Sequence, residues 1–245
     1  MQLHCLGVSG YHPSQTRQTA CFMLPEIGVV LDAGTGMHRV RSRIATPELE
    51  IFLSHAHLDH VIGVTFLFDT IYQKETSVRV HAEPDKIDAI RTHLLAPLLF
   101  PVAPPCQFAP LAKEVTLPGG GRLSWFPLTH PGGSVGYRLD FADRSMAYVT
   151  DTTAAADAAY VEKIRGVDLL VHECYFPDGF EEFAQTTGHS CVTPVAEVAQ
   201  AAGVGRLVLT HLSPLDDQKD PIGLDVARQI FPATILAEDE MVIDF

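Results

Sequence analysis

The stretch His55-Ala56-His57-Leu58-Asp59-His60 places three imidazoles and one carboxylate within six positions. Burying that many polar groups in an apolar core without partners would cost about 2 kcal/mol or more for each group. A metal ion is a partner that fits all of them. Neutral imidazole nitrogens combined with a carboxylate oxygen suit zinc, manganese or iron better than calcium or magnesium. We therefore predict a divalent metal site, with zinc expected and manganese as the alternative.

The sequence around this stretch indicates how it is held. Residues 50–54 form a short apolar run typical of a buried strand, so the metal-binding stretch is expected at the C-terminal end of a strand. The apolar pattern resumes from Gly63 to Ile71, which predicts that the next helix begins after the stretch. A surface histidine cluster or an affinity-tag remnant is the alternative, but tags lie at termini and lack an interleaved aspartate.

The rest of the chain reads as strands first and then as alternating helices and strands. Strands are expected at residues 3–7, 20–24, 28–32, 50–54, 78–81, 123–128, 135–141, 145–150, 168–172, 206–210 and 234–238, and at the terminal residues 241–245. Helices are expected near residues 63–71, 86–95, 154–165, 194–202 (capped by Thr193) and 224–231. This order predicts an α/β fold with two sheets packed face to face and helices outside. The 245 residues are expected to form one domain, residues 1–245.

Composition limits the partners and the compartment. No apolar run approaches the roughly 20 residues of a membrane span, and the first residues do not form a signal peptide. Five scattered cysteines, none in a C-x-x-C pair, predict reduced thiols in a cytoplasmic protein. The net charge of −13 disfavours an extensive nucleic-acid interface. Arg39, Arg41 and Arg43 are the longest basic cluster, and we expect them on a solvated helix face.

Three further polar residues follow apolar runs that predict strands. His130 follows residues 125–129, Asp151 follows residues 146–150, and His211 follows residues 207–210. A single histidine after a strand is usually an ordinary loop residue. Three such positions in the same chain as the 55–60 stretch indicate ligands of the same metal site.

These residues and several longer motifs resemble the metallo-β-lactamase superfamily, and more closely its ribonuclease Z-like branch. The resemblance runs from about residue 1 to 215 and rests on the H-x-H-x-D-H stretch and on five motifs: Asp32-Ala33-Gly34-Thr35-Gly36, Tyr148-Val149-Thr150-Asp151-Thr152, Leu169-Leu170-Val171-His172-Glu173, Gly188-His189-Ser190 and Leu207-Val208-Leu209-Thr210-His211-Leu212-Ser213. It implies an αββα sandwich, in which two mixed β-sheets are flanked by helices.

The resemblance also implies roles for individual residues at two divalent metal ions. His55, His57 and His130 would bind the first ion, and Asp59, His60 and His211 the second. Asp151 would bridge both ions. Glu173 and His189 match positions that support the ligands and transfer protons, and Asp59 would also orient the attacking hydroxide.

Two departures from ribonuclease Z bear on the substrate. The family's long arm, which grips the tRNA elbow, is inserted between the positions that match His130 and Asp151. Here these residues are separated only by two expected strands, so the arm is absent. After Ser213 the chain reads Pro214-Leu215-Asp216-Asp217, which is acidic where the family carries an arginine and a tyrosine.

The sequence therefore predicts a metal-dependent phosphodiesterase. Two ions about 3.5–4 Å apart can share a hydroxide that attacks a phosphoryl group. The short connection and the acidic charge favour a compact substrate such as a cyclic nucleotide or cyclic phosphate. One alternative is a tRNA 3′-processing endoribonuclease that works without its arm, with a homodimer partner supplying basic surface.

Two other readings stay open at this point. A lactonase or arylsulfatase of the same superfamily would use the same ligands on a substrate without phosphate. A metal-binding structural or sensor module would need closed coordination with no open position for water, and seven ligands shared by two ions argue against it.

Overall fold

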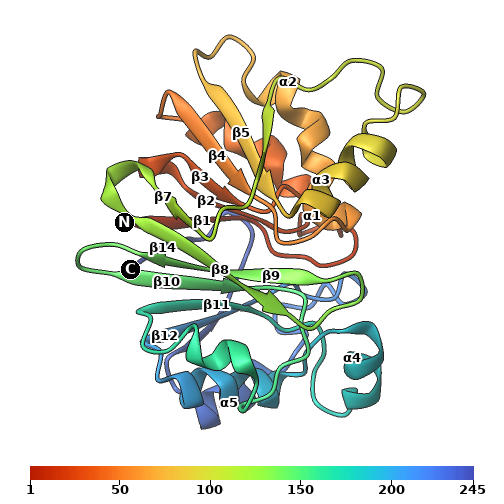
Figure 1. The fold of residues 1–245 in the computed structure, drawn as a ribbon. Helices are drawn as coiled ribbons and strands as arrows, with labels where there is room; N and C mark the ends of the chain where they lie inside the picture. Colours follow the sequence, from red (N-terminus) through yellow and green to blue (C-terminus); the bar gives the residue numbers. More distant parts are fainter. The chain divides into compact units, whose positions relative to one another are not determined.

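The computed structural model describes residues 1–245, and the chain divides into two compact units that are each discontinuous in sequence. The first unit comprises residues 1–113, 117–119 and 238–244, and the second comprises residues 114–116, 120–237 and 245. Each unit contains one seven-stranded mixed sheet flanked by helices, so the predicted α/β class with two mixed sheets is confirmed (Figure 1). That residues 1–245 form one domain remains a prediction.

The sheet of the first unit has the order β14-β1-β2-β3-β4-β5-β6. Its strands are β1 (Gln2–Gly7), β2 (Cys21–Leu24), β3 (Val29–Leu31), β4 (Glu48–Phe52), β5 (Ser77–Ala82), β6 (Gln107–Pro110) and β14 (Val242–Asp244). From β14 to β3 neighbouring strands are antiparallel, and from β3 to β6 they are parallel. The predicted strands are present, whereas β6 was not predicted. The carboxyl ends of β3 and β4 lie at one edge because these two strands are parallel.

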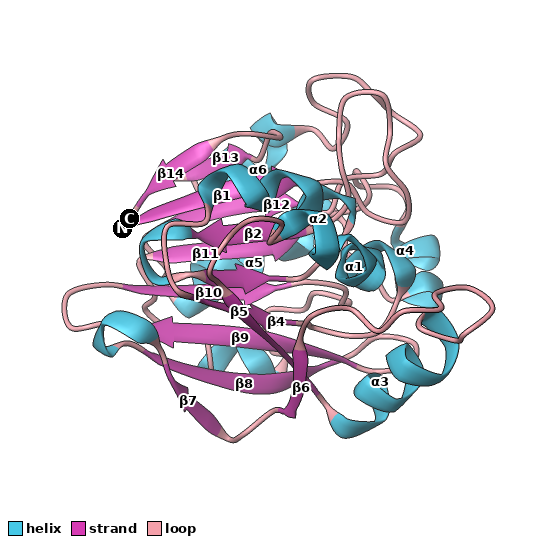
Figure 2. Cartoon of the chain, turned by 90° about the horizontal axis from the view of Figure 1, so that it is seen from above, coloured by secondary structure: helices cyan, strands magenta, loops and turns pink.

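Short helices cover one face of this sheet (Figures 1 and 2). They are η2 (Thr35–Arg43), α1 (Leu58–Val61), η3 (Ile62–Phe66), α2 (Leu67–Thr70), α3 (Pro84–Ala89) and a π-helical turn, η4 (Ile90–Leu94), whereas η1 (Pro25–Ile27) forms the connection between β2 and β3. Ile51 of β4 and Val80 of β5 belong to one buried apolar cluster with Met37 and Leu67 of the helices. On the opposite face of β4, Glu50 and Phe52 are also buried and only Glu48 at the start of the strand is exposed, which explains the apolar run of a parallel strand.

The helix after β4 begins earlier than predicted. α1 begins at Leu58, inside the 55–60 stretch, and His57 is its N-cap residue with extended backbone angles. Asp59 therefore lies in the first helical turn, where a carboxylate interacts favourably with the helix dipole. The prediction of a helix starting near residue 63 was wrong because three short helical segments replace one long periodic helix.

The sheet of the second unit has the order β13-β12-β11-β10-β9-β8-β7. Its strands are β7 (Glu114–Thr116), β8 (Arg122–Leu128), β9 (Ser134–Asp140), β10 (Ser145–Val149), β11 (Leu169–Glu173), β12 (Arg206–Thr210) and β13 (Thr234–Leu236). From β7 to β10 the strands are antiparallel, and from β10 to β13 they are parallel. The carboxyl ends of β8, β10, β11 and β12 therefore lie at the same edge of this sheet.

Only a tight turn connects β9 and β10. Phe141 N–H donates to the Arg144 carbonyl oxygen at 2.8 Å, which closes the hairpin. The segment between His130 and Asp151 consists of these two strands and their loops. The predicted absence of an arm at this position is confirmed.

The helices of the second unit are η6 (Ala159–Glu162), α4 (Glu181–Thr187), α5 (Val192–Ala202) and α6 (Leu224–Ile230). The helix predicted at residues 154–165 is wrong, because only η6 forms there. The backbone N–H groups of Thr153 and Ala154 donate instead to the Thr129 carbonyl oxygen and to Ser190 Oγ, at 3.3 and 2.9 Å. These tertiary hydrogen bonds override the helix propensity of the alanine-rich segment.

The cap of α5 also differs from the prediction. Cys191 is the N-cap residue, and Thr193 lies in the first turn of the helix. The Thr193 N–H and hydroxyl groups donate to the two carboxylate oxygens of Asp178 at 3.0 and 2.6 Å. The capping acceptor therefore comes from a distant residue, which sequence spacing does not indicate.

Arg39 and Arg43 do not form the solvated face that the sequence predicted. Arg39 forms ion pairs with Asp239 and Glu240 and donates to the Leu6 carbonyl oxygen at 2.6 Å, while Arg43 pairs with Glu240. These contacts join η2 to the segment that precedes β14. The prediction was wrong because the acidic partners lie about two hundred residues away in sequence.

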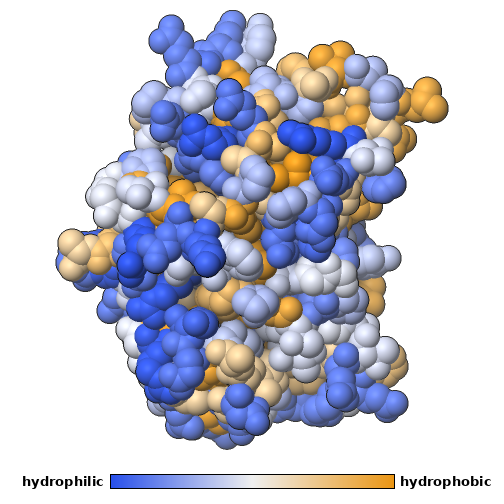
Figure 3. Space-filling view, viewed as in Figure 1, coloured by the Kyte–Doolittle hydropathy of each residue, from blue (hydrophilic) through white to orange (hydrophobic).

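Two surface features complete the description. Loop 95–106 of the first unit exposes Leu98, Leu99 and Val102, and Figure 3 shows hydrophobic surface over this loop.

None of the helices combines the length and apolar character needed to cross a membrane. All five cysteines are free thiols, as predicted, and four of them are buried.

Candidate metal centre

The first unit brings together the four predicted ligands of the 55–60 stretch. His55 lies in the loop after β4, and His60 lies in α1. The ring centroid of His55 lies 4.5 Å from that of His57 and 4.3 Å from that of His60. His55, Asp59 and His60 are buried, whereas His57 is exposed. The stretch therefore folds back so that its imidazoles face one another.

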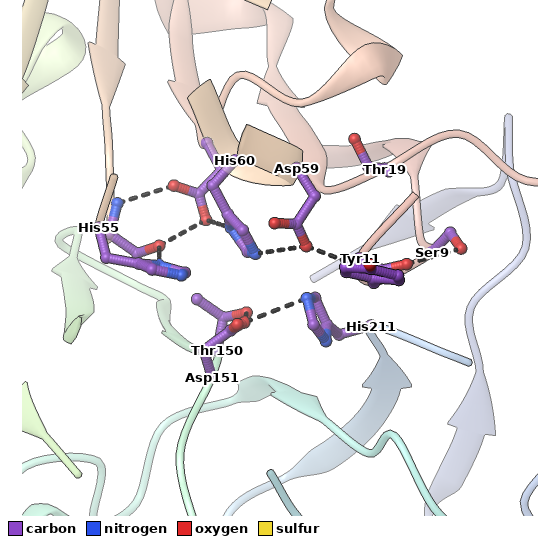
Figure 4. Close-up of polar contacts among 12 residues, drawn as sticks. Ser9, Tyr11, Thr19, His55, Asp59, His60, Thr150, Asp151 and His211 are labelled. Atoms are coloured by element: carbon purple, nitrogen blue, oxygen red, sulfur yellow. Dashed lines mark hydrogen bonds and ion pairs between the residues drawn. The ribbon is translucent and has the colours of Figure 1, made fainter. Parts of the chain in front are cut away.

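Asp32 fixes the orientation of this group, of which Figure 4 labels His55, Asp59 and His60. The Nδ1–H group of His60 donates to Asp32 Oδ2 at 2.8 Å, and the hydroxyl of Ser54 donates to the same oxygen at 2.9 Å. The Ser54 N–H donates to Asp32 Oδ1 at 2.7 Å. Because the Ser54 hydroxyl hydrogen is used, its oxygen accepts from His55 Nδ1–H at 3.0 Å. His55 and His60 are therefore both protonated at Nδ1, which leaves Nε2 as the nitrogen able to bind a metal.

Asp59 is positioned by the N-terminal loop. Its Oδ2 accepts a hydrogen bond from the backbone N–H of Tyr11 at 2.7 Å and lies 3.4 Å from His60 Nε2. Tyr11 has a left-handed backbone with φ of 60°. The carboxylate and the imidazole of neighbouring helical residues thus present an oxygen and a nitrogen to the same point.

The second unit places Asp151 between two imidazoles. Asp151 Oδ2 lies 3.6 Å from His130 Nε2, and Asp151 Oδ1 lies 3.2 Å from His211 Nε2, the pair that Figure 4 joins by a dashed line. Each carboxylate oxygen therefore faces a different histidine. Donor atoms of Asp151, His189 and His211 also lie within 4.8 Å of one another. This geometry suits a carboxylate that bridges two cations, because an ionised carboxylate offers lone pairs on both oxygens.

Gly188 determines how His130 is oriented. The Nδ1–H group of His130 donates to the Gly188 carbonyl oxygen at 2.8 Å, which leaves Nε2 unprotonated and directed toward Asp151. Gly188 has φ of +75°, and a Cβ atom there would lie 2.8 Å from His130 Nδ1 and 2.4 Å from Pro131 Cδ. Glycine is therefore required at this position both by its backbone angle and by the closeness of His130.

Glu173 is fully buried and holds His189. Its Oε1 accepts from His189 Nδ1–H at 3.2 Å and from the Thr152 N–H at 3.0 Å, while its Oε2 accepts from the Ser190 N–H at 3.3 Å. One carboxylate thus ties the loop after β10 to the loop before α5. With Nδ1–H bonded to Glu173, Nε2 of His189 carries no proton in the neutral ring and carries one in the charged ring. A proton-transfer group must be able to take up and release a proton in this way.

Three residues of the two half-sites have a left-handed backbone. Asp32, Asp151 and His211 have φ values of 59°, 43° and 56°, and each follows the end of a parallel strand. Such conformations cost of order 1–3 kcal/mol in non-glycine residues and persist where the surrounding structure enforces them. Their occurrence at three polar strand ends indicates that both edges are built to present side chains.

The structure thus places every predicted site residue in one of two groups. His55, His57, Asp59 and His60 group together in the first unit, and His130, Asp151, Glu173, His189 and His211 in the second. Three supporting groups were not predicted: the Asp32 carboxylate, the Gly188 carbonyl and the Tyr11 amide. Asp32 and Gly188 lie within the motifs noted in the sequence, but their function is hydrogen bonding to a ligand, which the sequence does not specify.

The buried residue before Glu173, His172, makes the free energy of unfolding depend on pH. His172 accepts a hydrogen bond from the Tyr160 hydroxyl at Nε2 and donates from Nδ1 to the Glu173 carbonyl oxygen, at 2.9 and 2.7 Å. Burial lowers the pKa of His172 from its ordinary value of 6.5, and the Glu173 carbonyl and carboxylate oppose this shift. The unfolded chain therefore binds a proton that the folded chain excludes. The free energy of unfolding should fall as pH drops below 6.5, by at most about 1.4 kcal/mol per pH unit from this group.

We expect His172→Gln to lose this share of the pH dependence, although glutamine can still accept from Tyr160. Urea unfolding of metal-free wild type and variant, between about pH 7.5 and about pH 5.5, measures it. All other ionisable groups are the same in both proteins, so their effect cancels in the difference. Parallel pH profiles for the two proteins would contradict the assignment.

Comparison with known proteins identifies the family. The profile of the Beta-lactamase superfamily domain matches residues 28–212, which is more than half of the chain. The chain belongs to this superfamily. A ribonuclease Z from Synechococcus sp. (strain WH7803) is 28% identical over 315 aligned positions, which cover 100% of this chain and 96% of that protein. The superfamily member is thus ribonuclease Z-like, as its motifs predicted.

Solved structures confirm the fold of this superfamily member. The metallo-beta-lactamase fold protein YhfI from Bacillus subtilis has a TM-score of 0.83 and 19% identity, with 99% of each chain covered. The short form of human tRNase Z has a TM-score of 0.75 and 24% identity, covering 100% of this chain and 99% of that one. The predicted metallo-β-lactamase fold is therefore confirmed.

Membership of this family, together with the ribonuclease Z relatives, shows that the protein is a metal-dependent hydrolase. Its imidazole nitrogens and carboxylate oxygens are suitable ligands for divalent metal ions. His55, His60 and His130 each have Nδ1–H bonded to an oxygen acceptor, which is the usual arrangement of histidines that bind a metal through Nε2. Asp151 presents both oxygens to imidazole nitrogens. Nitrogen and carboxylate donors without thiolates are typical of catalytic rather than of purely structural zinc sites.

Proposed function

We propose that this superfamily member is a phosphodiesterase with two divalent ions, zinc expected and manganese the alternative. Asp151 carries the proposal, since its two carboxylate oxygens face different imidazoles, His130 and His211. In this proposal His55, His57 and His130 would hold one ion, Asp59, His60 and His211 would hold the other, and Asp151 would contribute to both.

The ions would supply an activated water and neutralise charge on a phosphoryl oxygen. The protein's own groups supply the remaining steps. His189, oriented by Glu173, is placed to protonate the departing alkoxide, and general-acid help of this kind contributes typically 10²–10⁴-fold. Asp59, fixed by the Tyr11 amide, is placed to orient the attacking water.

A compact substrate, such as a cyclic nucleotide or a cyclic phosphate, fits the chain better than a folded RNA. The alignment with the Synechococcus ribonuclease Z has 315 positions whereas this chain has 245 residues, so at least 70 positions have no counterpart here. A tight turn connects β9 and β10 where that family carries its arm. The net charge of −13 and the acidic pair Asp216-Asp217 after the His211 motif both disfavour a long polyanion.

Processing of tRNA 3′ ends is a second candidate, because a relative that aligns over the whole chain is named ribonuclease Z. The enzyme would then need basic surface from elsewhere, such as the second copy in a homodimer. A lactonase or arylsulfatase activity remains as a third outcome of a substrate screen. The five free thiols support a reducing compartment, and we propose the cytoplasm.

A screen of purified enzyme separates these candidates. We expect two metal ions per chain, turnover of cyclic phosphodiesters and of bis(p-nitrophenyl) phosphate, and loss of turnover after chelation that the metal restores. Binding of tRNA, measured at two salt concentrations, should be weak and should show a shallow salt slope because few phosphates are contacted. Tight tRNA binding with a steep slope would select the tRNA candidate, and turnover of lactones or sulfate esters alone would reject phosphodiester hydrolysis.

A further inference from the structure

A row of aromatic rings leads away from His189 in the second unit. Tyr175 stacks on His189, with 4.8 Å between ring centroids and 19° between ring planes. Phe176 lies 4.8 Å from Tyr175, Phe180 stacks on Phe176 at 5.8 Å and 10°, and Phe183 lies 6.4 Å from Phe180. We call these four rings, Tyr175, Phe176, Phe180 and Phe183, the aromatic row.

The outer end of the aromatic row is exposed without a structural need for it. Phe180 and Phe183 are 46% and 64% exposed, although both are large apolar side chains. The short helix α4 packs through Ala184, which is its one buried residue. Exposed phenylalanines therefore contribute little to the packing of α4. Leucine at position 183 would maintain the helix propensity, and Phe180 is the N-cap residue, outside the helix.

The inner end of the aromatic row reaches the candidate metal ligands. The Tyr175 ring lies 5.9 Å from the His211 ring, and His189 stacks on His211 at 5.2 Å. A substrate whose flat group stacks on the aromatic row can therefore place its reacting group near His189 and His211. A phosphodiester that carries a nucleobase has this combination of a flat ring and a reacting phosphate.

We propose that the aromatic row is a stacking surface for a nucleobase of the substrate, so that the substrate class is a nucleotide phosphodiester. Aromatic side chains bind bases through their faces, largely independently of base identity. Asp178, Glu181 and Glu182 flank Phe180, and their charges repel phosphate but not the neutral face of a base. The inference rests on the proposed phosphodiesterase function. The rings are positioning groups, because they contact the base rather than the reacting atoms.

A fluorescent base tests this proposal independently of turnover. The probes are 2-aminopurine riboside 2′,3′-cyclic phosphate and a short single-stranded oligoribonucleotide containing 2-aminopurine, whose fluorescence is quenched when the base stacks. Wild type should quench the fluorescence on binding. Phe180→Leu and Phe183→Leu retain apolar volume but remove the ring, and we expect them to weaken binding roughly tenfold or more, while Phe180→Tyr retains it.

Phe141→Leu is the matched control. Phe141 lies at the turn between β9 and β10, at the opposite end of these strands from His130 and Asp151. This variant should quench as wild type does. A loss confined to the oligoribonucleotide in Phe183→Leu indicates a strand along the row, and a loss with both probes in Phe180→Leu indicates a single base.

The turnover assay distinguishes failure of this inference from failure of the proposed function. Oligoribonucleotides with a base or with an abasic site next to the cleaved bond are compared by kcat/KM. The base should raise kcat/KM in wild type and raise it less in Phe180→Leu. Quenching without any hydrolysis would overturn the phosphodiesterase but retain base stacking. If kcat/KM were the same with a base and with an abasic site, and the probes were not quenched, the stacking proposal alone would be overturned.

Discussion

Replacing Asp151 with asparagine should remove at least one of two bound metal ions and lower kcat by about 10²–10³-fold or more. An amide offers one oxygen acceptor and no negative charge. It therefore cannot bind one ion next to His130 and a second ion next to His211 at the same time. Asparagine is the informative substitution because Asp151 has φ of 43°, a left-handed conformation that asparagine tolerates better than alanine. The loss can then be attributed to the carboxylate rather than to the backbone.

The measurement is metal content per chain, by elemental analysis after gel filtration, together with turnover of bis(p-nitrophenyl) phosphate. Asp157→Asn serves as the control, since Asp157 is an exposed carboxylate of the same unit. That variant should retain both ions and full activity. Two ions in the Asp151→Asn protein would show that Asp151 does not bridge.

Replacing His189 with alanine should leave the metal content unchanged and lower kcat by about 10²–10⁴-fold on substrates with an alkoxide leaving group. The reason is that His189, held by Glu173, is placed to donate a proton to the departing oxygen. A p-nitrophenolate leaving group needs little protonation. The defect on bis(p-nitrophenyl) phosphate should therefore be much smaller than the defect on a cyclic nucleotide.

Glu173→Gln provides the companion variant. Glutamine retains one acceptor oxygen but replaces the other with an amide group that cannot accept from the Ser190 N–H. We expect intact metal content and a loss of about 10–100-fold, smaller than for His189→Ala. If His189→Ala instead lost metal in proportion to its loss of activity, His189 would be a metal ligand, a role that its closeness to Asp151 and His211 allows.

The sequence predicted most strands because most of the parallel strands are buried on both faces and therefore read as apolar runs. β6, which is parallel but has no buried residue, was not predicted. The sequence predicted helices less well where tertiary contacts decide the backbone. The segment after Asp151 is alanine-rich, yet Ala154 bonds to Ser190 rather than continuing a helix. Conversely, α1 forms within the 55–60 stretch, whose histidines and aspartate carry no apolar periodicity.

The candidate ligands were predictable from residue type, since histidine and aspartate after apolar runs are visible in the sequence. Their supports were not. Asp32 and the Gly188 carbonyl act on His60 and His130 through hydrogen bonds that span 28 and 58 residues. Nothing in local periodicity indicates such pairs, and they become apparent only when the strand ends are placed at one edge of each sheet.

The path of the chain between the two units has a consequence for synthesis. β14 completes the first sheet by pairing with β1, and Arg39 of that unit binds Asp239 just before β14. All strands of the second unit are translated between these two parts of the first. On the ribosome, β1 therefore remains an open edge until the whole second unit has emerged. The first sheet can therefore be completed only after the second unit has been synthesised, so complete folding of the first unit should be a late event in synthesis.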